Sequence, residues 1–420
     1  MQHSRRPRRM PHLSILVFIA SVFLSTTFCV NGAFAADKVG ARSNSSVQFK
    51  VLYSFTGGSD GCCIYGGLGR DRHSGDLYGV AYSGYDLTGD GDLFKLTRTQ
   101  RGYSFHVLEY FSSAKGRECS TTPVVDASGN IFGVCFGGGS GDKGTLWEYS
   151  HKGKFKVLHS FDGPGDGMSL QDSVALDGSG HIYGTAYTWG PGGSGTFWKY
   201  SLRSGSFTLL HSFADGDDGA LLPAGPKIDQ ETGMIWGTTE FGPNCYYCGQ
   251  GTVWDYDPSS GTFTTVLTFD STNILAPQSR VEVGEKGNVF GTAFGSDGGY
   301  GNCGLVYGLQ KENSYTPSIA YEFTGSDGDG CDAFGRVRFN EQGHLLGTTY
   351  DGGEFGDGTI YELEHKNGGW QETILHSFDG SDGVRPQSGL ITDHKDNWFG
   401  TTSLGGKNKW GTVFEISGVR

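Results

Sequence analysis

One short phrase is written several times along the chain, at nearly constant intervals. "VLHSFDGPGDG" begins at Val157, "LLHSFADGDDG" at Leu209 and "ILHSFDGSDG" at Ile374. Aligned on the phenylalanine of the phrase, related segments recur every 50–56 residues, at Phe55, Phe111, Phe161, Phe213, Phe269, Phe323 and Phe378. Self-similarity at about this period marks repeat architectures such as propellers, so this feature constrains the fold more than any other.

Each repeat unit has four short segments in a fixed order, and each segment has the pattern of a β-strand. A segment such as "SVALDGSG" comes first, followed by "HIYGTAY", "GTFWKYS" and "FTLLHSF". All four are rich in β-branched or aromatic residues and are bounded by turn-forming Gly, Asp, Ser or Asn. A lone four-stranded sheet cannot bury both of its faces, whereas sheets stacked in a ring do. We therefore predict an all-β fold, a seven-bladed β-propeller of four-stranded antiparallel blades.

Large side chains recur at one position of the second segment and at one position of the third. Large apolar side chains at a fixed repeat position usually build the shared core, so we predict that these residues pack between blades. The second-segment residues are Tyr78, Phe132, Tyr183, Trp236, Phe290, Leu346 and Phe399. The third-segment residues are Phe94, Trp147, Trp198, Trp254, Tyr307, Tyr361 and Phe414. The histidines of "LHSF" (His159, His211 and His376) also keep one position, and we interpret them as structural strand residues.

The two ends of the repeat region complement each other. "SVQFKVLYSF", residues 46–55, is a fourth strand with no first three before it. The last unit, residues 389–420, has three strands and no fourth. Pairing the two fragments would remove exposed strand edges. We therefore predict that the propeller is closed by pairing of the N- and C-terminal strands, which together form the seventh blade.

The repeated segments resemble a known family. Text such as "SGLITDHKDNWFGTTSLGG" and "GTVFEIS", combined with "LHSF", is similar to the GloVer tandem repeat of exported bacterial proteins. The resemblance covers nearly all of residues 48–416 and recurs in seven units. It implies a propeller-like exported protein from a family that carries no established activity or catalytic residues.

The N-terminus has the features of a secretory signal. Four arginines within residues 5–9 precede an apolar run, and Ala33 and Ala35 flank Phe34 as a small-residue cleavage site. The run is also about long enough for a membrane anchor, and we favour cleavage. We expect a signal peptide at 1–35, a flexible mature N-terminus at 36–45 and a single propeller at 46–420. The protein is then secreted or periplasmic, with no membrane span in the mature chain.

The charge balance bears on the partner. The net charge is -13, and the only cluster of basic residues lies at the extreme N-terminus. We therefore expect no nucleic-acid partner. The pattern does not predict an oligomeric state.

Alternating strands place two kinds of loop on each face of a propeller. We call upper face the one that carries the loops between second and third strands and the loops from a fourth strand to the next first strand. These loops are long and rich in glycine, and the cysteines of the mature chain lie in them or at their rim: Cys62, Cys63, Cys119, Cys135, Cys245, Cys248, Cys303 and Cys331. An even set in an exported protein indicates disulfides.

Loop adjacency suggests which of these cysteines pair. We predict a Cys303–Cys331 disulfide, because the two residues lie at the junction of consecutive blades. We expect Cys62 or Cys63 to pair with Cys119 or Cys135 of the adjacent blade. Cys245 and Cys248, in "CYYC", form a small loop staple rather than a redox or zinc site.

Two sets of upper-face or axial residues are candidates for ligand binding. Flat rings among Gly, Asn and Asp suit sugar recognition, although such rings also fill gaps between loops. The aromatic candidates are Trp189, Tyr246, Tyr247, Tyr300 and Phe355. The charged candidates are Lys227, Glu282 and Arg338, at matching positions of three successive first strands. They would form a structural ion-pair ladder or a polar lining for a ligand in the channel.

The stretch "DLTGDGDL" resembles the first half of a calcium loop. Asp86, Thr88, Asp90 and the carbonyl of Asp92 match its first ligands, but Thr97 stands where the bidentate acid is due. We expect no obligatory cofactor and keep calcium as the one candidate.

The function hypotheses rest on the upper face. The chain has no H-E-x-x-H or phosphate-loop motif. We favour a non-enzymatic binding or scaffold module that recognises a glycan or a protein. The alternatives are a carbohydrate-active enzyme, a glycosidase or lyase that uses carboxylates on that face, and a purely structural envelope protein.

Overall fold

The computed structural model describes residues 47–83, 90–100, 102–242, 250–270, 274–295 and 303–419. The chain divides into two compact units, Met1–Ala41 and Arg42–Arg420, and all described residues belong to the second. The expected signal peptide and the segment 36–45 therefore lie outside the described residues. No helix in the described ranges combines the length and apolar composition needed to cross a bilayer.

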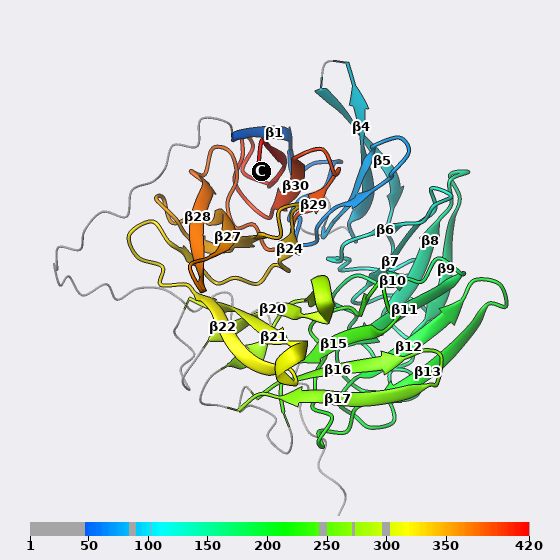
Figure 1. The fold of residues 1–420 in the computed structure, drawn as a ribbon. Helices are drawn as coiled ribbons and strands as arrows, with labels where there is room; N and C mark the ends of the chain where they lie inside the picture. The colour runs from blue at the N-terminus through cyan, green and yellow to red at the C-terminus, as the bar shows by residue number, and fades with distance from the viewer. Residues whose placement is uncertain are drawn as a thin grey trace, which may run out of the picture. The chain divides into compact units, whose positions relative to one another are not determined.

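The described residues form seven blades around an axis, which confirms the predicted β-propeller (Figure 1). The first strands lie nearest the axis: β2 (Gly69–Arg70), β6 (Val124–Val125), β10 (Ala175–Leu176), β14 (Lys227–Ile228), β19 (Glu282–Val283), β24 (Arg338–Phe339) and β29 (Ile391–Thr392). The second strands are β3 (Leu77–Ala81), β7 (Ile131–Cys135), β11 (His181–Ala186), β15 (Ile235–Thr239), β20 (Val289–Gly295), β25 (Leu345–Thr349) and β30 (Asn397–Thr402).

The third and fourth strands follow outwards in each blade, and all pairs are antiparallel. The third strands are β4 (Asp92–Thr99), β8 (Thr145–Tyr149), β12 (Thr196–Ser201), β16 (Thr252–Asp257), β21 (Leu305–Gln310), β27 (Thr359–Lys366) and β31 (Thr412–Ser417). The fourth strands are β5 (Gly102–Tyr110), β9 (Phe155–Ser160), β13 (Ser206–Ser212), β17 (Thr262–Thr268), β22 (Thr316–Glu322), β28 (Gly369–Ser377) and β1 (Gln48–Ser54). Minor elements are β18 (Leu275–Pro277), β23 (Gly330–Cys331), β26 (Asp351–Gly352), η2 (Glu285–Gly287) and η3 (Lys311–Asn313).

A glycine on each second strand makes room for the large ring on the third strand. Gly184 lies opposite Trp198 in the register of β11 and β12, and a Cβ at residue 184 would overlap the indole ring. The same pairing of glycine and ring occurs in all seven blades. In each blade the register of the third and fourth strands also shifts beside this ring, as between Phe197 and Trp198. A bulge at this place bends the outer strand over the ring.

The recurring aromatics form the core, as predicted. The seven third-strand rings, from Phe94 to Phe414, have no exposed surface. The second-strand residues are at most 8 % exposed, and the exceptional Leu346 is fully buried. Packing between blades therefore supplies most of the apolar burial that holds the ring together.

The ring closes where the sequence pattern placed the closure. β1 pairs with β31 from Gln48 opposite Ser417 to Ser54 opposite Thr412. The backbone N–H of Phe55 donates to the carbonyl of Gly411 at 3.0 Å, and each of the other six marker phenylalanines makes the equivalent bond in its own blade. The seventh blade is thus built from both ends of the propeller.

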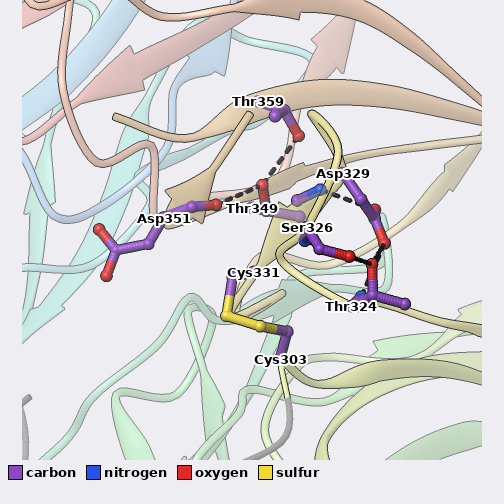
Figure 2. The surroundings of a disulfide bond; sticks show 9 residues. Cys303, Thr324, Ser326, Asp329, Cys331, Thr349, Asp351 and Thr359 are labelled. Atoms are coloured by element: carbon purple, nitrogen blue, oxygen red, sulfur yellow. Dashed lines mark hydrogen bonds between the residues drawn. A yellow bond between two sulfur atoms is a disulfide. The ribbon is translucent and has the colours of Figure 1, made fainter. Parts of the chain in front are cut away.

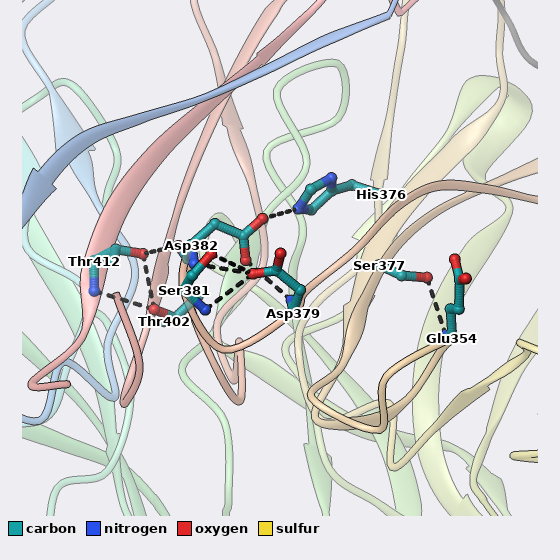
Figure 3. Close-up of polar contacts among 8 residues, drawn as sticks. All are labelled: Glu354, His376, Ser377, Asp379, Ser381, Asp382, Thr402 and Thr412. Carbon is teal, nitrogen blue, oxygen red and sulfur yellow. Dashed lines mark hydrogen bonds and ion pairs between the residues drawn. The ribbon is translucent and has the colours of Figure 1, made fainter. Parts of the chain in front are cut away.

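The "LHSF" histidines join one blade to its own loop and to the next blade, which supports their structural interpretation. His376 Nε2 lies 2.8 Å from Asp382 Oδ2 in the following loop (Figure 3). Its ring stacks on Phe49 of the next fourth strand, with centroids 3.7 Å apart. His159 and His211 make the same two contacts, to an aspartate and to a phenylalanine of the next blade.

Candidate ligand-binding face

The loops that enter each first strand share an unusual backbone conformation. At one equivalent position of each of these seven loops, a residue other than glycine has a positive φ, between 50° and 63°. The residues are Cys63, Glu118, Ser169, Leu221, Ala276, Asp332 and Arg385. Left-handed conformations are unfavourable for residues with a Cβ, so their recurrence at one repeat position shows that the loop geometry is imposed by the fold. This geometry sets the side chains of the seven positions on the upper face.

A second set of equivalent positions lies at the end of each second strand, directly after it in six blades and within β20 in the fifth. We call these residues the mouth ring: Tyr82, Phe136, Tyr187, Glu240, Phe294, Tyr350 and Ser403. Five of the seven are aromatic, and four of these rings (Tyr82, Phe136, Tyr187 and Phe294) are half-buried. By the symmetry of the propeller, the mouth ring surrounds the axis at the upper face.

Hydrogen bonds connect the mouth ring between the third and fifth blades. Tyr187 Oη donates to Glu240 Oε2 at 2.8 Å, and Gln278 Nε2 lies 3.5 Å from Glu240 Oε1. Burial raises the pKa of Glu240 above its ordinary value, against the opposing effect of these two donors. A carboxyl group in this state is held within a polar network rather than exposed to bulk water.

Aromatic contacts connect the mouth ring around the sixth blade. Phe334 packs against Phe294 and against Tyr350, with centroids 6.0 Å and 5.7 Å apart. The Arg385 guanidinium lies 4.9 Å from the centroid of Tyr350, and its Nε lies 3.6 Å from Asp351 Oδ1. The upper face here combines ring faces with charged groups.

Asp332 and Asp351 form an acidic pair in the same region. Burial and the nearby Asp351 raise the pKa of Asp332 to about 6. Burial also raises the pKa of Asp351, although Arg385 acts in the opposite direction. Perturbed carboxyl groups of this kind are suited to proton transfer.

Two of the five predicted sugar-stacking aromatics lie in the described loops, and both are exposed. The side chain of Trp189 is 47 % exposed, and Lys143 Nζ lies 5.8 Å from its ring centroid. The side chain of Phe355 is 57 % exposed. Tyr246, Tyr247 and Tyr300 lie outside the described residues. Exposed large rings on a loop are available to a ligand, whereas those of the core are not.

One predicted disulfide is present. Cys303 and Cys331 are bonded, with an S–S distance of 2.03 Å, at the junction that the sequence indicated (Figure 2). Around it, Thr324 N and Oγ1 both donate to Asp329 Oδ2, and Thr349 Oγ1 contacts Thr359 Oγ1. The bond therefore joins a turn with its own hydrogen-bond network to the preceding blade.

The expected pairing of Cys62 or Cys63 with Cys119 or Cys135 is wrong. Cys119 is bonded to Cys135 instead, at the end of the second strand of its own blade. Cys62 and Cys63 are free and buried, with their sulfur atoms 2.9 Å apart. The reason is local, because Cys62 N donates to Ser83 O and so binds its loop to its own blade. The "CYYC" cysteines, Cys245 and Cys248, lie outside the described residues.

The calcium hypothesis falls partly on residues that are not described. Asp86 and Thr88 lie outside the described ranges, and Asp90 and Asp92 lie inside them. The hypothesis uses the backbone carbonyl of Asp92, a residue that opens β4 and is 1 % exposed. Within the described ranges no group of three His, Cys, Asp or Glu side chains is placed to hold a metal ion.

The predicted charged ladder is present in part. Lys227 Nζ lies 2.6 Å from Glu282 Oε2, across the first strands of neighbouring blades. Arg338 makes no ion pair with Glu282 within 4.0 Å, although its charge helps to lower the pKa of that carboxyl. The sequence interpretation missed Arg280 and Arg336, which precede Glu282 and Arg338 by two residues.

A shallow hollow of about 170 Å³ lies on the opposite, lower face. Its lining includes Asn340, Gln342, His394 and Trp398, from turns of the sixth and seventh blades. It contains none of the predicted candidates. Of the candidate ligand-binding residues that the sequence singled out, Lys227 and Glu282 are in contact. The described aromatics Trp189 and Phe355 lie on loops of different blades.

Comparisons with known proteins agree with this architecture. The family model described as Gloeobacter/Verrucomicrobia repeat matches residues 86–295 and 276–419, which confirms the resemblance found in the sequence. No curated protein matches the chain in sequence.

Solved structures that resemble the chain are distant. An oligogalacturonate lyase in complex with manganese has a TM-score of 0.57 at 13% identity, over 91% of this chain and 95% of that one. The oligogalacturonate lyase of Vibrio parahaemolyticus has a TM-score of 0.56 at 13% identity, over 89% and 94%. A putative 6-phosphogluconolactonase from Bacteroides uniformis has a TM-score of 0.51 at 12% identity, over 74% and 84%. At these identities the likeness shows the propeller fold alone.

Proposed function

We propose that this chain, which belongs to the Gloeobacter/Verrucomicrobia repeat family, is a binding module that recognises a glycan on its upper face. The mouth ring carries this proposal. Its residues vary among Tyr, Phe, Glu and Ser, so the ring offers both apolar faces and polar groups around the axis. A surface of this mixed character is expected of a site that fits an asymmetric ligand.

The chemistry of the upper face suits a sugar. Half-buried rings offer apolar faces for C–H groups, and the partly exposed Gln278 and Asp351 offer hydrogen-bond partners for hydroxyl groups. Trp189 and Phe355 add exposed rings on the same face. Surfaces with this mixture bind ligands that are themselves apolar on one side and polar on the other.

A glycan array with purified protein tests the proposal. We expect binding to a defined set of polysaccharides and a loss of roughly tenfold or more in affinity for W189A or F355A, because each variant removes a stacking ring. Both rings are exposed, so neither variant should unfold the protein. L202A is the matched control, since Leu202 is also an exposed apolar side chain but lies in a turn of the lower face. Absence of glycan binding, or equal losses for all three variants, would overturn the proposal in favour of a protein ligand or a structural role.

An enzymatic function is the second candidate, because of the Asp332–Asp351 pair. A carboxyl group with a pKa of about 6 beside a second carboxyl group resembles the acid–base pairs of carbohydrate-active enzymes. Release of reducing or unsaturated sugar ends by the wild type, lost in D332N and retained in D90N, would support it. A wild type that binds polysaccharides without cleaving them would exclude this activity for those polymers.

We also propose that the protein is exported. The two disulfides are compatible with an extracellular or periplasmic location. Export with cleavage after Ala35 predicts that the mature protein begins at Ala36. N-terminal sequencing of the exported protein checks this, and retention of residues 1–35 would contradict it.

A further inference from the structure

Three successive blades present a cluster of charged side chains to the axis. Its members are Lys227 on β14, Arg280 and Glu282 at β19, and Arg336 and Arg338 at β24, and we call them the axial cluster. Arg280 and Arg336 lie two residues before Glu282 and Arg338, in the segments that lead into β19 and β24. Arg280 Nη1 donates to Ser173 Oγ at 3.0 Å, although Ser173 precedes β10, two blades away. This contact places the Arg280 guanidinium on the axial side.

The cations of the axial cluster are incompletely paired. Lys227 uses Glu282, at 2.6 Å. Beyond its single bond to Ser173, Arg280 has a buried Nε with no partner. The side chains of Arg336 and Arg338 make no hydrogen bond or ion pair within the described part of the chain. A partly buried guanidinium group without hydrogen-bond acceptors is energetically unfavourable, so a bound anion would stabilise this arrangement.

The charge count leads to the same conclusion. Four cations face two carboxylates, Glu282 and Asp172, which leaves an excess of two positive charges in a protein of net charge -13. Burial, together with repulsion from Arg338 and Arg280, lowers the pKa of Arg336 to about 9. The charge of Asp172 acts in the opposite direction, and its Oδ2 also accepts the N–H of Gly225 at 2.9 Å.

The neighbouring blade leaves space for these side chains. Gly389 of the seventh blade lies against the Arg336 side chain, and a Cβ there would overlap its Cγ. Arg280, Arg336 and Arg338 are each half-buried, so solvent still reaches them at the axis. A small anionic group can therefore approach the guanidinium groups from the mouth ring.

We propose that the axial cluster is a carboxylate-binding site, with Arg336, Arg338 and Arg280 as donors. The carboxylate is carried by an acidic sugar of a glycan held at the mouth ring, or by a small free acid. The first of these sources rests on the proposed function. Guanidinium groups bind carboxylates through paired, charge-assisted hydrogen bonds, which distinguish an acidic sugar from its neutral counterpart.

Titration calorimetry with two matched probes tests the site. The probes are trigalacturonic acid and a neutral trisaccharide of the same length, with citrate as the small free acid. We expect the wild type to bind an acidic probe, and R336Q and R280Q to bind it about ten- to a hundredfold more weakly, the range for a lost hydrogen bond to a charged group. R203Q is the control, because Arg203 is an exposed arginine in a lower-face turn. The affinity should also fall as sodium chloride is raised.

The outcomes separate the two proposals. Weaker binding of acidic probes by R336Q, but not by R203Q, supports the site. If neutral and acidic trisaccharides bind the wild type equally, or R336Q matches the wild type, the carboxylate site is refuted while glycan binding stands. If citrate binds through Arg336 and no glycan binds, the site stands and the proposed function fails. R336K keeps the positive charge but loses the planar pair of donors. It controls for a loss of binding caused by misfolding, and we expect it to bind the acidic probe with an affinity between those of the wild type and R336Q.

Discussion

Replacing Asp92 with threonine should stabilise the protein, and more so as the pH rises. Asp92 opens the third strand of the first blade, where five of the other six blades have threonine and one has Leu305. In four of the five blades with threonine, the hydroxyl donates to a carbonyl of the preceding loop. Thr412 Oγ1, for example, donates to Asp382 O at 3.1 Å (Figure 3). Asp92 is 1 % exposed, and its Oδ1 has no hydrogen-bond partner.

The magnitude follows from the pKa of Asp92. Burial, with smaller contributions from Asp60 and Cys62, raises it from 3.8 to about 8. A shift of about four pKa units corresponds to a cost of at most roughly 5–6 kcal/mol for ionising Asp92 in the folded protein. Relaxation around the charge lowers the expected cost to about 2–5 kcal/mol. Because the folded-state pKa is raised, the stability contributed by the protonated carboxyl is complete below pH 3.8 and is lost as the pH rises through about 8.

Urea unfolding of wild type, D92T and D92N at pH 5, 7 and 9, followed by tryptophan fluorescence, measures this effect. The free energy of unfolding of D92T should exceed that of the wild type by a margin that grows with pH, because all other titrating groups are shared and cancel. D92N should show the same trend without the added threonine hydrogen bond. D90N, at a neighbouring aspartate, should show none. A D92T advantage that is equal at pH 5 and pH 9 would refute the reasoning.

Three further predictions concern closure, packing and the cysteines. F49A should lower the free energy of unfolding by about 2–4 kcal/mol, because the stacked pair of Phe49 and His376 joins β1 to the sixth blade. A double-mutant cycle with H376A should reveal coupling between the two residues, and additive losses would contradict this. G237A should lower the melting temperature strongly, since the added Cβ would overlap the Trp254 ring. In the control G178A nothing lies near the added atom, so that variant should lose only the stability that corresponds to the strain of its positive φ. Equal effects of the two variants would count against the steric explanation. Peptide mapping under non-reducing conditions should find Cys119–Cys135 and Cys303–Cys331 bonded. Among the six cysteines that the structure describes, it should find two alkylatable thiols, Cys62 and Cys63, and a peptide linking the first blade to the second would disprove the assignment.

The fold was predictable because it depends on periodic burial. A large ring opposite a glycine, like Trp198 opposite Gly184, recurs in every unit. The pattern alone therefore identifies the strands, the pairing of neighbouring strands and the core residues. Closure was predictable for a similar reason, since Phe55 and Gly411 belong to complementary incomplete units. Edge strands need partners, and only one arrangement supplies them.

The candidate site was less predictable, because it lies where the repeat varies. The left-handed residue at the equivalent position of each upper loop, such as Arg385, is never glycine, so no composition signal marks it. Cys119 pairs within its own blade because of loop conformation, which spacing along the chain does not encode. Arg336 was accessible to sequence reasoning, since it lies two residues before Arg338, but its importance comes from the absence of acceptors around it.

Closure through β1 and β31 has a consequence for how the protein is made. β1 leaves the ribosome before every other strand of the propeller, and its partner β31 leaves after them all. Throughout synthesis β1 therefore has no partner strand, and the first blade has a neighbour on one side only. Closure of the ring must await the last strand.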